Sequence, residues 1–72
     1  MTLEEKQEAL ADIFDCEAGS LLPDVALDTL PWDSMARVTL IAVARTRFNV
    51  KIAGAELLGF RTVGDIFSAL ER

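Results

Sequence analysis

The sequence predicts an all-α fold, a small four-helix bundle with three main helices, a short third helix and a long ordered loop between helices one and two. Two observations carry this prediction. Apolar residues recur at helical spacing in three segments, and the alternating stretch at residues 48–52 has no partner strand. Because 72 residues leave room for one core, we expect a single domain over residues 1–72.

The first helix is expected at residues 3–15. Thr2 and Glu5 have the spacing of a capping box, in which each side chain accepts a hydrogen bond from the other residue's backbone N–H. The acidic residues of this segment fall on the other side of the helix and should face water. The stripe expected to face the core consists of Leu3, Ala9, Leu10, Ala11, Ile13 and Phe14.

A long loop follows at residues 16–33. Gly19, Pro23 and Pro31 interrupt regular structure there. A loop of this length is uncommon in a compact domain and often has a function, which makes its end a candidate for the functional site. The apolar residues of the loop that should pack on the core are Leu21, Leu22, Val25, Leu27 and Leu30.

The second helix is expected at residues 34–47, followed by an extended connection at residues 48–52. Its apolar stripe is wide enough to face the middle of a bundle. The side expected to face the core consists of Met35, Val38, Leu40, Ile41, Ala42, Arg45 and Phe48.

Two more helices are expected near the C-terminus. A short one at residues 55–58 is stopped by Gly59. Thr62, with an acid three positions later, should cap a fourth helix at residues 63–71. Its apolar residues follow helical spacing closely and are Val63, Ile66, Phe67 and Leu70.

Missing residue types exclude several kinds of protein. The chain has no histidine, which excludes a Ser-His-Asp or Cys-His mechanism built within it and removes the commonest metal ligand. Cys16 is the only cysteine, so no internal disulfide or cysteine-based metal site can form. The chain is also too short to surround a substrate with catalytic groups. We therefore expect a binding or carrying protein, without a metal site, rather than an enzyme.

The N-terminal sequence and the lengths of the apolar stretches bear on location. Residues 1–5 are acidic and lack the basic and apolar regions of a signal peptide. The longest apolar stretch, near residues 38–44, is far shorter than the roughly 20 residues that cross a bilayer. We expect a cytoplasmic monomer without membrane insertion.

Charge is distributed unevenly within the net charge of −5. Residues 1–33 carry nine acidic and one basic side chains, whereas residues 34–48 carry Arg37, Arg45, Arg47 and no acid. An acidic chain is a poor general binder of nucleic acid, which argues against a small helical DNA-binding module that uses these arginines. The arginines form either a solvated helix face or a docking surface for an acidic partner.

Ser34 is the strongest candidate for a site. It follows Asp33 at the point where the loop ends and the second helix begins. Because the chain has no histidine to activate it, any chemistry at this serine must be performed by another protein. Asp33 or Ser34 can also serve simply as the helix cap, and capping is compatible with carrying a group.

Three segments of the chain resemble the acyl carrier protein and peptidyl carrier protein family. Residues 33–35, Asp-Ser-Met, look like the family's Asp-Ser-Leu motif. Residues 48–52 look like the segment between its second and third helices, and residues 62–66 look like the start of its last helix. The resemblance covers nearly the whole chain, from the first helix to Leu70.

The resemblance implies that Ser34 is modified with 4′-phosphopantetheine, transferred from coenzyme A by a magnesium-dependent phosphopantetheinyl transferase. The thiol of this arm would hold acyl or aminoacyl groups as thioesters, supplied by a loading ligase and used by downstream synthase or transferase enzymes. Asp33 would help the transferase hold metal or position the hydroxyl. The physics agrees, because a helix N-terminus presents unpaired N–H groups and a positive dipole end to a phosphate.

The second helix departs from the fatty-acid type of the family, whose members usually carry acids there. We therefore expect a stand-alone carrier with specialised partners, in secondary metabolism or cell-envelope biosynthesis rather than housekeeping fatty-acid synthesis. The non-acidic residues at those positions are Ala36, Thr39, Arg45, Thr46 and Arg47. The residues expected to recognise partners are Trp32, Met35, Arg37, Arg45 and Arg47.

An attached acyl chain could tuck between the second and third helices. The residues that could line such a gap are Val38, Ile41, Ile52 and Phe60, and an ordinary core is an equal interpretation of them. Trp32 could grip a partner or the arm, or pack on the loop. A helical interaction domain that kept the carrier fold without carrying an arm remains the alternative function.

Overall fold

The computed structural model of the chain describes residues 2–71, so the ends of the predicted domain, Met1 and Arg72, lie outside the described residues. This range contains four α-helices, which confirms the all-α prediction, and each helix boundary lies within one residue of its predicted position. None of the helices described has both the length and the apolar character needed to cross a membrane. The elements are α1 (Leu3–Phe14), η1 (Ala18–Ser20), η2 (Leu27–Thr29), α2 (Ser34–Phe48), α3 (Gly54–Leu57) and α4 (Val63–Leu70), where η denotes a 3₁₀ helix.

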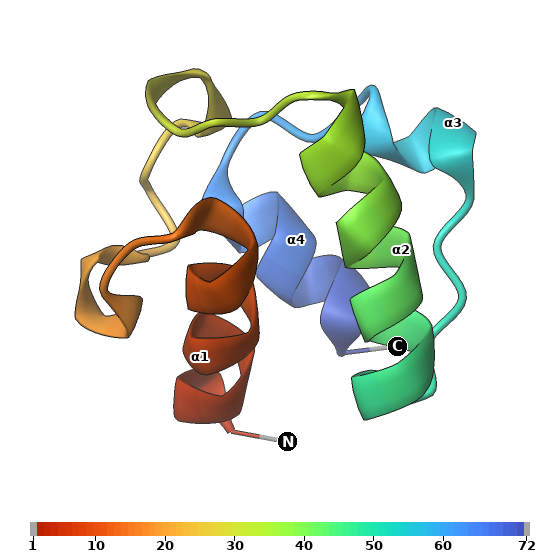
Figure 1. Ribbon diagram of the computed structural model, residues 1–72, viewed down its shortest axis with the longest axis horizontal. Coiled ribbons are helices and arrows are strands. Elements are labelled where there is room, and N and C mark those ends of the chain that lie inside the picture. Colours follow the sequence, from red (N-terminus) through yellow and green to blue (C-terminus); the bar gives the residue numbers. More distant parts are fainter. Residues whose placement is uncertain (1, 72) are drawn as a thin grey trace.

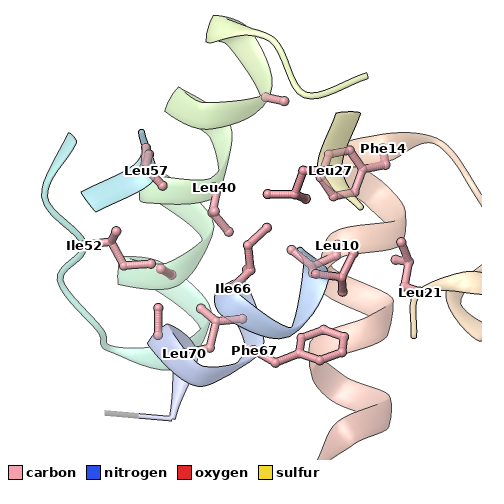
Figure 2. Packing of buried hydrophobic residues seen from close by; sticks show 14 of the residues in the cluster. Leu10, Phe14, Leu21, Leu27, Leu40, Ile52, Leu57, Ile66, Phe67 and Leu70 are labelled. Atoms are coloured by element: carbon pink, nitrogen blue, oxygen red, sulfur yellow. The ribbon is translucent and has the colours of Figure 1, made fainter. Parts of the chain in front are cut away.

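The core lies between three helices. Figure 1 shows α1 and α2 on either side of α4, with α3 beside the upper part of α2. The side chains of Leu10, Leu40 and Ile66, one from each main helix, meet in the middle and are fully buried (Figure 2). This packing leaves the first turn of α2, where the candidate serine lies, at the outer edge of the molecule.

Threonine caps start α1 and α4 as predicted, but within residues 2–71 the Thr2–Glu5 pair makes only one of the two hydrogen bonds of a capping box. The Thr2 hydroxyl accepts a hydrogen bond from the Glu5 N–H at 3.2 Å at the start of α1. At the start of α4, the Thr62 hydroxyl accepts from the Asp65 N–H, and the Asp65 carboxylate accepts from the Thr62 N–H at 3.1 Å. That carboxylate also accepts from the Arg61 N–H at 2.8 Å. These backbone hydrogen bonds lower the pKa of Asp65, because they favour its charged form.

The α1–α2 loop is fixed to the start of α4 by its backbone. Residues 23–27 run beside residues 61–64, and Ala26 and Thr62 form an isolated antiparallel bridge. The hydrogen bonds, each 2.9 Å long, run from Leu27 N to Arg61 O, from Val63 N to Val25 O and from Gly64 N to Pro23 O. A Cβ at position 64 would lie 2.8 Å from a Pro23 oxygen, so only glycine allows this approach. The loop is therefore ordered, as predicted.

The side of α2 that packs on the core differs from the predicted one. The buried face consists of Ala36, Leu40 and Ala44. The exposed face consists of Met35, Val38, Ala42 and Arg45. The prediction that these last four residues face the core was wrong, although Ile41 and Phe48 are half-buried. Small residues every four positions let the α2 backbone approach its neighbours closely, which leaves the bulkier side chains in solvent.

Smaller differences concern single residues of α1 and the loop. Leu3 and Leu22 are about half exposed, so the prediction that they pack on the core was wrong. Lys6 is instead buried, with 4% of its surface exposed. Its ammonium group pairs with Glu71 and lies 5.5 Å from the ring centroid of Phe67. The long aliphatic stem of a lysine packs like an apolar side chain when its charged end finds such partners.

Candidate functional site

Ser34 is the first residue of α2, and its side chain is exposed. Asp33 is the N-cap residue in an extended conformation, and its Oδ1 accepts a hydrogen bond from the Ala36 N–H at 2.8 Å. The Asp33 carbonyl accepts the next bond, from the Arg37 N–H at 3.0 Å. The local sequence therefore builds a capped helix start with an exposed serine at its first position.

The first turn of α2 fits a phosphodiester on the Ser34 oxygen. Within residues 2–71, the N–H groups of Ser34 and Met35 have no hydrogen-bond acceptor. Such unpaired N–H groups and the positive end of the helix dipole favour an anion at this place. The neighbouring Asp33 carboxylate would repel a phosphate, but one of its oxygens is held toward the helix backbone by Ala36.

Trp32, two residues before the serine, is half-buried, and one aromatic ring of α1 packs against it. Its ring packs on Phe14 of α1, with centroids 5.9 Å apart and ring planes tilted by 53°. It also lines a hollow of about 460 Å³, together with Leu27 of η2 and Phe60 of the α3–α4 connection. We call this space the Trp32 hollow. It is bounded elsewhere by Ala26, Asp28, Arg61 and Thr62.

Another hollow, smaller than the Trp32 hollow, is lined by residues of α1, of the end of the loop and of the first turns of α2. Its volume is about 290 Å³. Two carboxylates face it, from Asp12 and Asp33, so we call it the acidic hollow. Its other lining residues are Ile13, Pro31, Met35, Ala36 and Thr39. Sequence neighbours of Ser34 line both hollows, Trp32 the first and Asp33 and Met35 the second, and the two hollows differ in charge and in aromatic content.

The four residues predicted to line an acyl pocket lie in three different environments. Val38 belongs to the exposed face of α2, with 67% of its surface exposed. Ile52 is buried in the core, and Ile41 is half-buried. Phe60 lines the Trp32 hollow. The structure therefore does not bring these four side chains together around one gap between α2 and α3.

The arginines of α2 lie in different surroundings. Arg45 and Arg47 are exposed, whereas Arg37 is half-buried. The guanidinium of Arg47 lies 3.7 Å from the Asp12 carboxylate, an exposed pair that contributes little to stability. Arg45 lies on the exposed face with Met35, which has 77% of its surface exposed. Met35, Arg45 and Arg47 are therefore the exposed residues of α2 among the predicted partner contacts.

Sequence reasoning missed Phe14 and Leu27 as parts of the site. Phe14 supports the Trp32 ring, and Leu27 lines the hollow beside it. Both were predicted only as core residues, because their apolar character gives no sign of which loop residue they touch. Only the aromatic character of Trp32, beside the candidate serine, signalled that something packs there.

Comparisons with known proteins agree with this site. A model of the family described as phosphopantetheine attachment site matches residues 7–70. The meromycolate extension acyl carrier proteins of Mycobacterium leprae, Mycobacterium bovis and Mycobacterium tuberculosis are 27% identical to the chain over 66 residues. The aligned part is 90% of this chain but 57% of each relative, so the chain spans little more than half of their length. No solved structure matches the chain significantly.

The family match covers most of the chain, including the entire α2 start. Members of this family are non-catalytic carriers with covalently attached 4′-phosphopantetheine, and they interact with phosphopantetheinyl transferases and synthase enzymes. The predicted carrier role, cofactor and lack of enzymatic activity are confirmed at this level. The chain therefore belongs to the phosphopantetheine attachment family of carrier proteins.

Proposed function

We propose that Ser34 is the residue that carries the arm. The observation that carries this proposal is its exposed hydroxyl at the first residue of α2, next to N–H groups that lack an acceptor within residues 2–71. In the reaction the hydroxyl loses its proton and its oxygen forms the new bond to phosphorus, while 3′,5′-ADP leaves from coenzyme A. Since the chain has no histidine, the base that takes the proton belongs to the transferase.

The other serines are weaker candidates. Ser20 donates its hydroxyl hydrogen to the Glu17 carbonyl at 2.7 Å, within the loop. Ser68 lies in the second half of α4, away from any helix start. Neither has the unpaired N–H groups that make the α2 start suitable for a phosphate. Ser68 is exposed and therefore provides a matched control for Ser34.

The proposal includes a specialised pathway and acyl cargo. The relatives are named acyl carrier proteins of meromycolate extension, which favours acyl over aminoacyl groups. The exposed face of α2 supports a specialised partner set, because it combines apolar Met35 and Val38 with the positive charge of Arg45. Trp32, Arg37 and Arg47 remain proposed partner contacts. The proposal also includes a cytoplasmic monomer that acts in secondary metabolism or cell-envelope biosynthesis.

Intact mass measurement tests the role of Ser34. The purified chain is incubated with coenzyme A, magnesium and a broad-specificity phosphopantetheinyl transferase. We expect the mass of one phosphopantetheine to be added to the wild type and to Ser68→Ala, but not to Ser34→Ala. If several transferases add nothing to the folded wild type, the protein is the alternative, a helical interaction domain without an arm.

A swap into fatty-acid elongation tests the specialised partner set. With the arm attached, the chain should support elongation poorly, because its α2 carries arginines instead of acids. A variant with both Arg45→Glu and Arg47→Glu should work better than the wild type. Efficient elongation by the unaltered chain would contradict the specialised role while leaving Ser34 as the attachment residue.

A further inference from the structure

The Trp32 hollow lies within easy reach of the candidate attachment residue. Trp32 and Ser34 are two positions apart, and two residues of chain span at most about 7 Å. The loop that carries η2 and the connection before α4 both pass this end of α2 (Figure 1). The backbone bonds between residues 23–27 and 61–64 hold these two segments together, so the hollow is formed before any group is attached.

The lining of the Trp32 hollow suits an apolar cargo that is attached through an arm containing amide groups. Leu27, Trp32 and Phe60 supply apolar and aromatic surface, while Asp28 and Arg61 are exposed. The indole N–H of Trp32 has no acceptor within residues 2–71. Since no buried side-chain nitrogen within the described residues lacks a partner, this N–H is open to solvent, and an amide carbonyl of a tethered arm can accept a hydrogen bond from it there.

The acidic hollow suits the same group less well. It is lined by two acids, Asp12 and Asp33, and by no base. Arg47 lies 3.7 Å from the Asp12 carboxylate, but Asp33 would still repel the negative phosphodiester. An apolar cargo in this hollow would also cover charged carboxylates without offering them a hydrogen-bond partner, which is unfavourable. The Trp32 hollow is lined by one acid and one base, Asp28 and Arg61, so its charges balance. Of the two hollows lined by sequence neighbours of Ser34, charge and lining therefore favour the one beside Trp32.

We infer that the Trp32 hollow receives the arm and the first part of a short or aromatic acyl cargo in the modified protein. Trp32 and Phe60 form two of its walls, and Phe14 fixes the Trp32 ring from behind. The tether supplies a high local concentration, so even a shallow hollow can be occupied. This inference rests on the proposed attachment at Ser34, and it places the cargo by the loop rather than between α2 and α3.

The emission of Trp32 reports on this occupancy directly. The chain contains one tryptophan and no tyrosine, so its fluorescence excited near the indole band belongs to Trp32. The unmodified protein, the protein with the bare arm and the proteins with hexanoyl or benzoyl arms are prepared with the transferase and checked by intact mass. We expect the acylated forms to show a blue-shifted emission and a loss of acrylamide quenching relative to the unmodified protein.

Two variants locate the cargo. Phe60→Ala should abolish the cargo-dependent change in Trp32 emission, while the mass still shows the arm. Ile41→Ala should retain the change, because Ile41 belongs to the alternative position between α2 and α3. Backbone amide shifts of the unaltered protein make the result independent of variant folding. On acylation they should move at Ala26, Phe60 and Thr62 more than at Ile41 and Ile52.

The outcomes separate the inference from the proposed function. A mass without the arm would show that the attachment proposal fails. An attached acyl arm with unchanged Trp32 emission and with shifts centred on Ile41 and Ile52 would overturn the inference and leave the carrier function intact. Shifts centred on Asp12 and Thr39 would place the cargo in the acidic hollow and overturn it equally.

Discussion

The two faces of α2 differ in a way that their apolar content alone would not predict. The buried face combines Leu40 with the small residues Ala36 and Ala44, whereas the exposed face carries the bulkier Met35 and Val38. If burial of apolar area alone decided the orientation, the bulkier side chains would turn inward. Close approach of the helices decides instead, because alanines at four-residue spacing let the α2 backbone lie near the core.

The exposed face of α2 carries the residues of this helix that we propose contact partner proteins. Apolar side chains scattered on a surface need no explanation, but Met35 and Val38 stand one turn apart and close to the attachment serine. Methionine adapts its shape to different partners. The comparison therefore separates residues that stabilise α2 in the bundle from residues proposed to meet partners, and the two sets can be tested independently.

The largest expected difference between the faces comes from truncating a large side chain on each. Leu40→Ala should lower the free energy of unfolding by about 3 kcal/mol, because it leaves a cavity in the core. Val38→Ala should change it by less than about 0.5 kcal/mol, since the side chain is mostly exposed. Urea unfolding followed by circular dichroism measures both. Equal losses of unfolding free energy in the two variants would show that Val38 packs against the core in solution, which would contradict the difference between the two faces.

A smaller effect is expected from enlarging an alanine on each face. Ala44→Leu should lower the free energy of unfolding by about 2 kcal/mol, because the new side chain has no space between the helices. Ala42→Leu is the matched change on the exposed face and should be nearly neutral. If the Ala44 variant is as stable as the wild type, close approach does not determine which face is buried.

The position of each helix could be predicted from the sequence because its signals are local. Thr2 and Thr62 cap their helices through residues three positions away, and apolar spacing marks the segments between. The inward face of α2 could not be predicted in the same way. Apolar residues occur on several sides of this helix, so spacing alone does not select Leu40 over Val38 as the residue that meets the core.

The candidate serine was also a local prediction, whereas the hollow beside it was not. Ser34 follows from a motif and a helix start within a few residues. The contact of Trp32 with Phe14 and the shared hollow with Phe60 join residues that lie far apart in the sequence. Those contacts depend on how the loop is fixed to α4, in which Gly64 takes part through its approach to Pro23.

Asp33, the N-cap residue of α2, allows a role in folding and a role in modification to be compared at one position. Asp33→Ala should lower the free energy of unfolding by about 1 kcal/mol, because the Ala36 N–H loses its acceptor. Asp33→Asn should keep most of that stability, since asparagine caps helices about as well. If the carboxylate also serves the transferase, both variants will acquire the arm more slowly, as followed by intact mass. Normal modification of Asp33→Asn would assign this residue to capping alone.

The smallest effect concerns the acid at the start of α4, which caps a helix without any proposed carrier role. Backbone hydrogen bonds from Arg61 and Thr62 lower the pKa of Asp65 in the folded protein. Its stabilising contribution is therefore fully present above the unfolded pKa of about 3.9 and is lost as pH falls through the lower folded value. Urea unfolding at a series of pH values should show a shallower loss of stability below about pH 4 in Asp65→Asn than in the wild type. Identical pH profiles would mean that the Asp65 carboxylate does not hold the start of α4 in solution, and acid-dependent stability would then have to arise at other carboxylates.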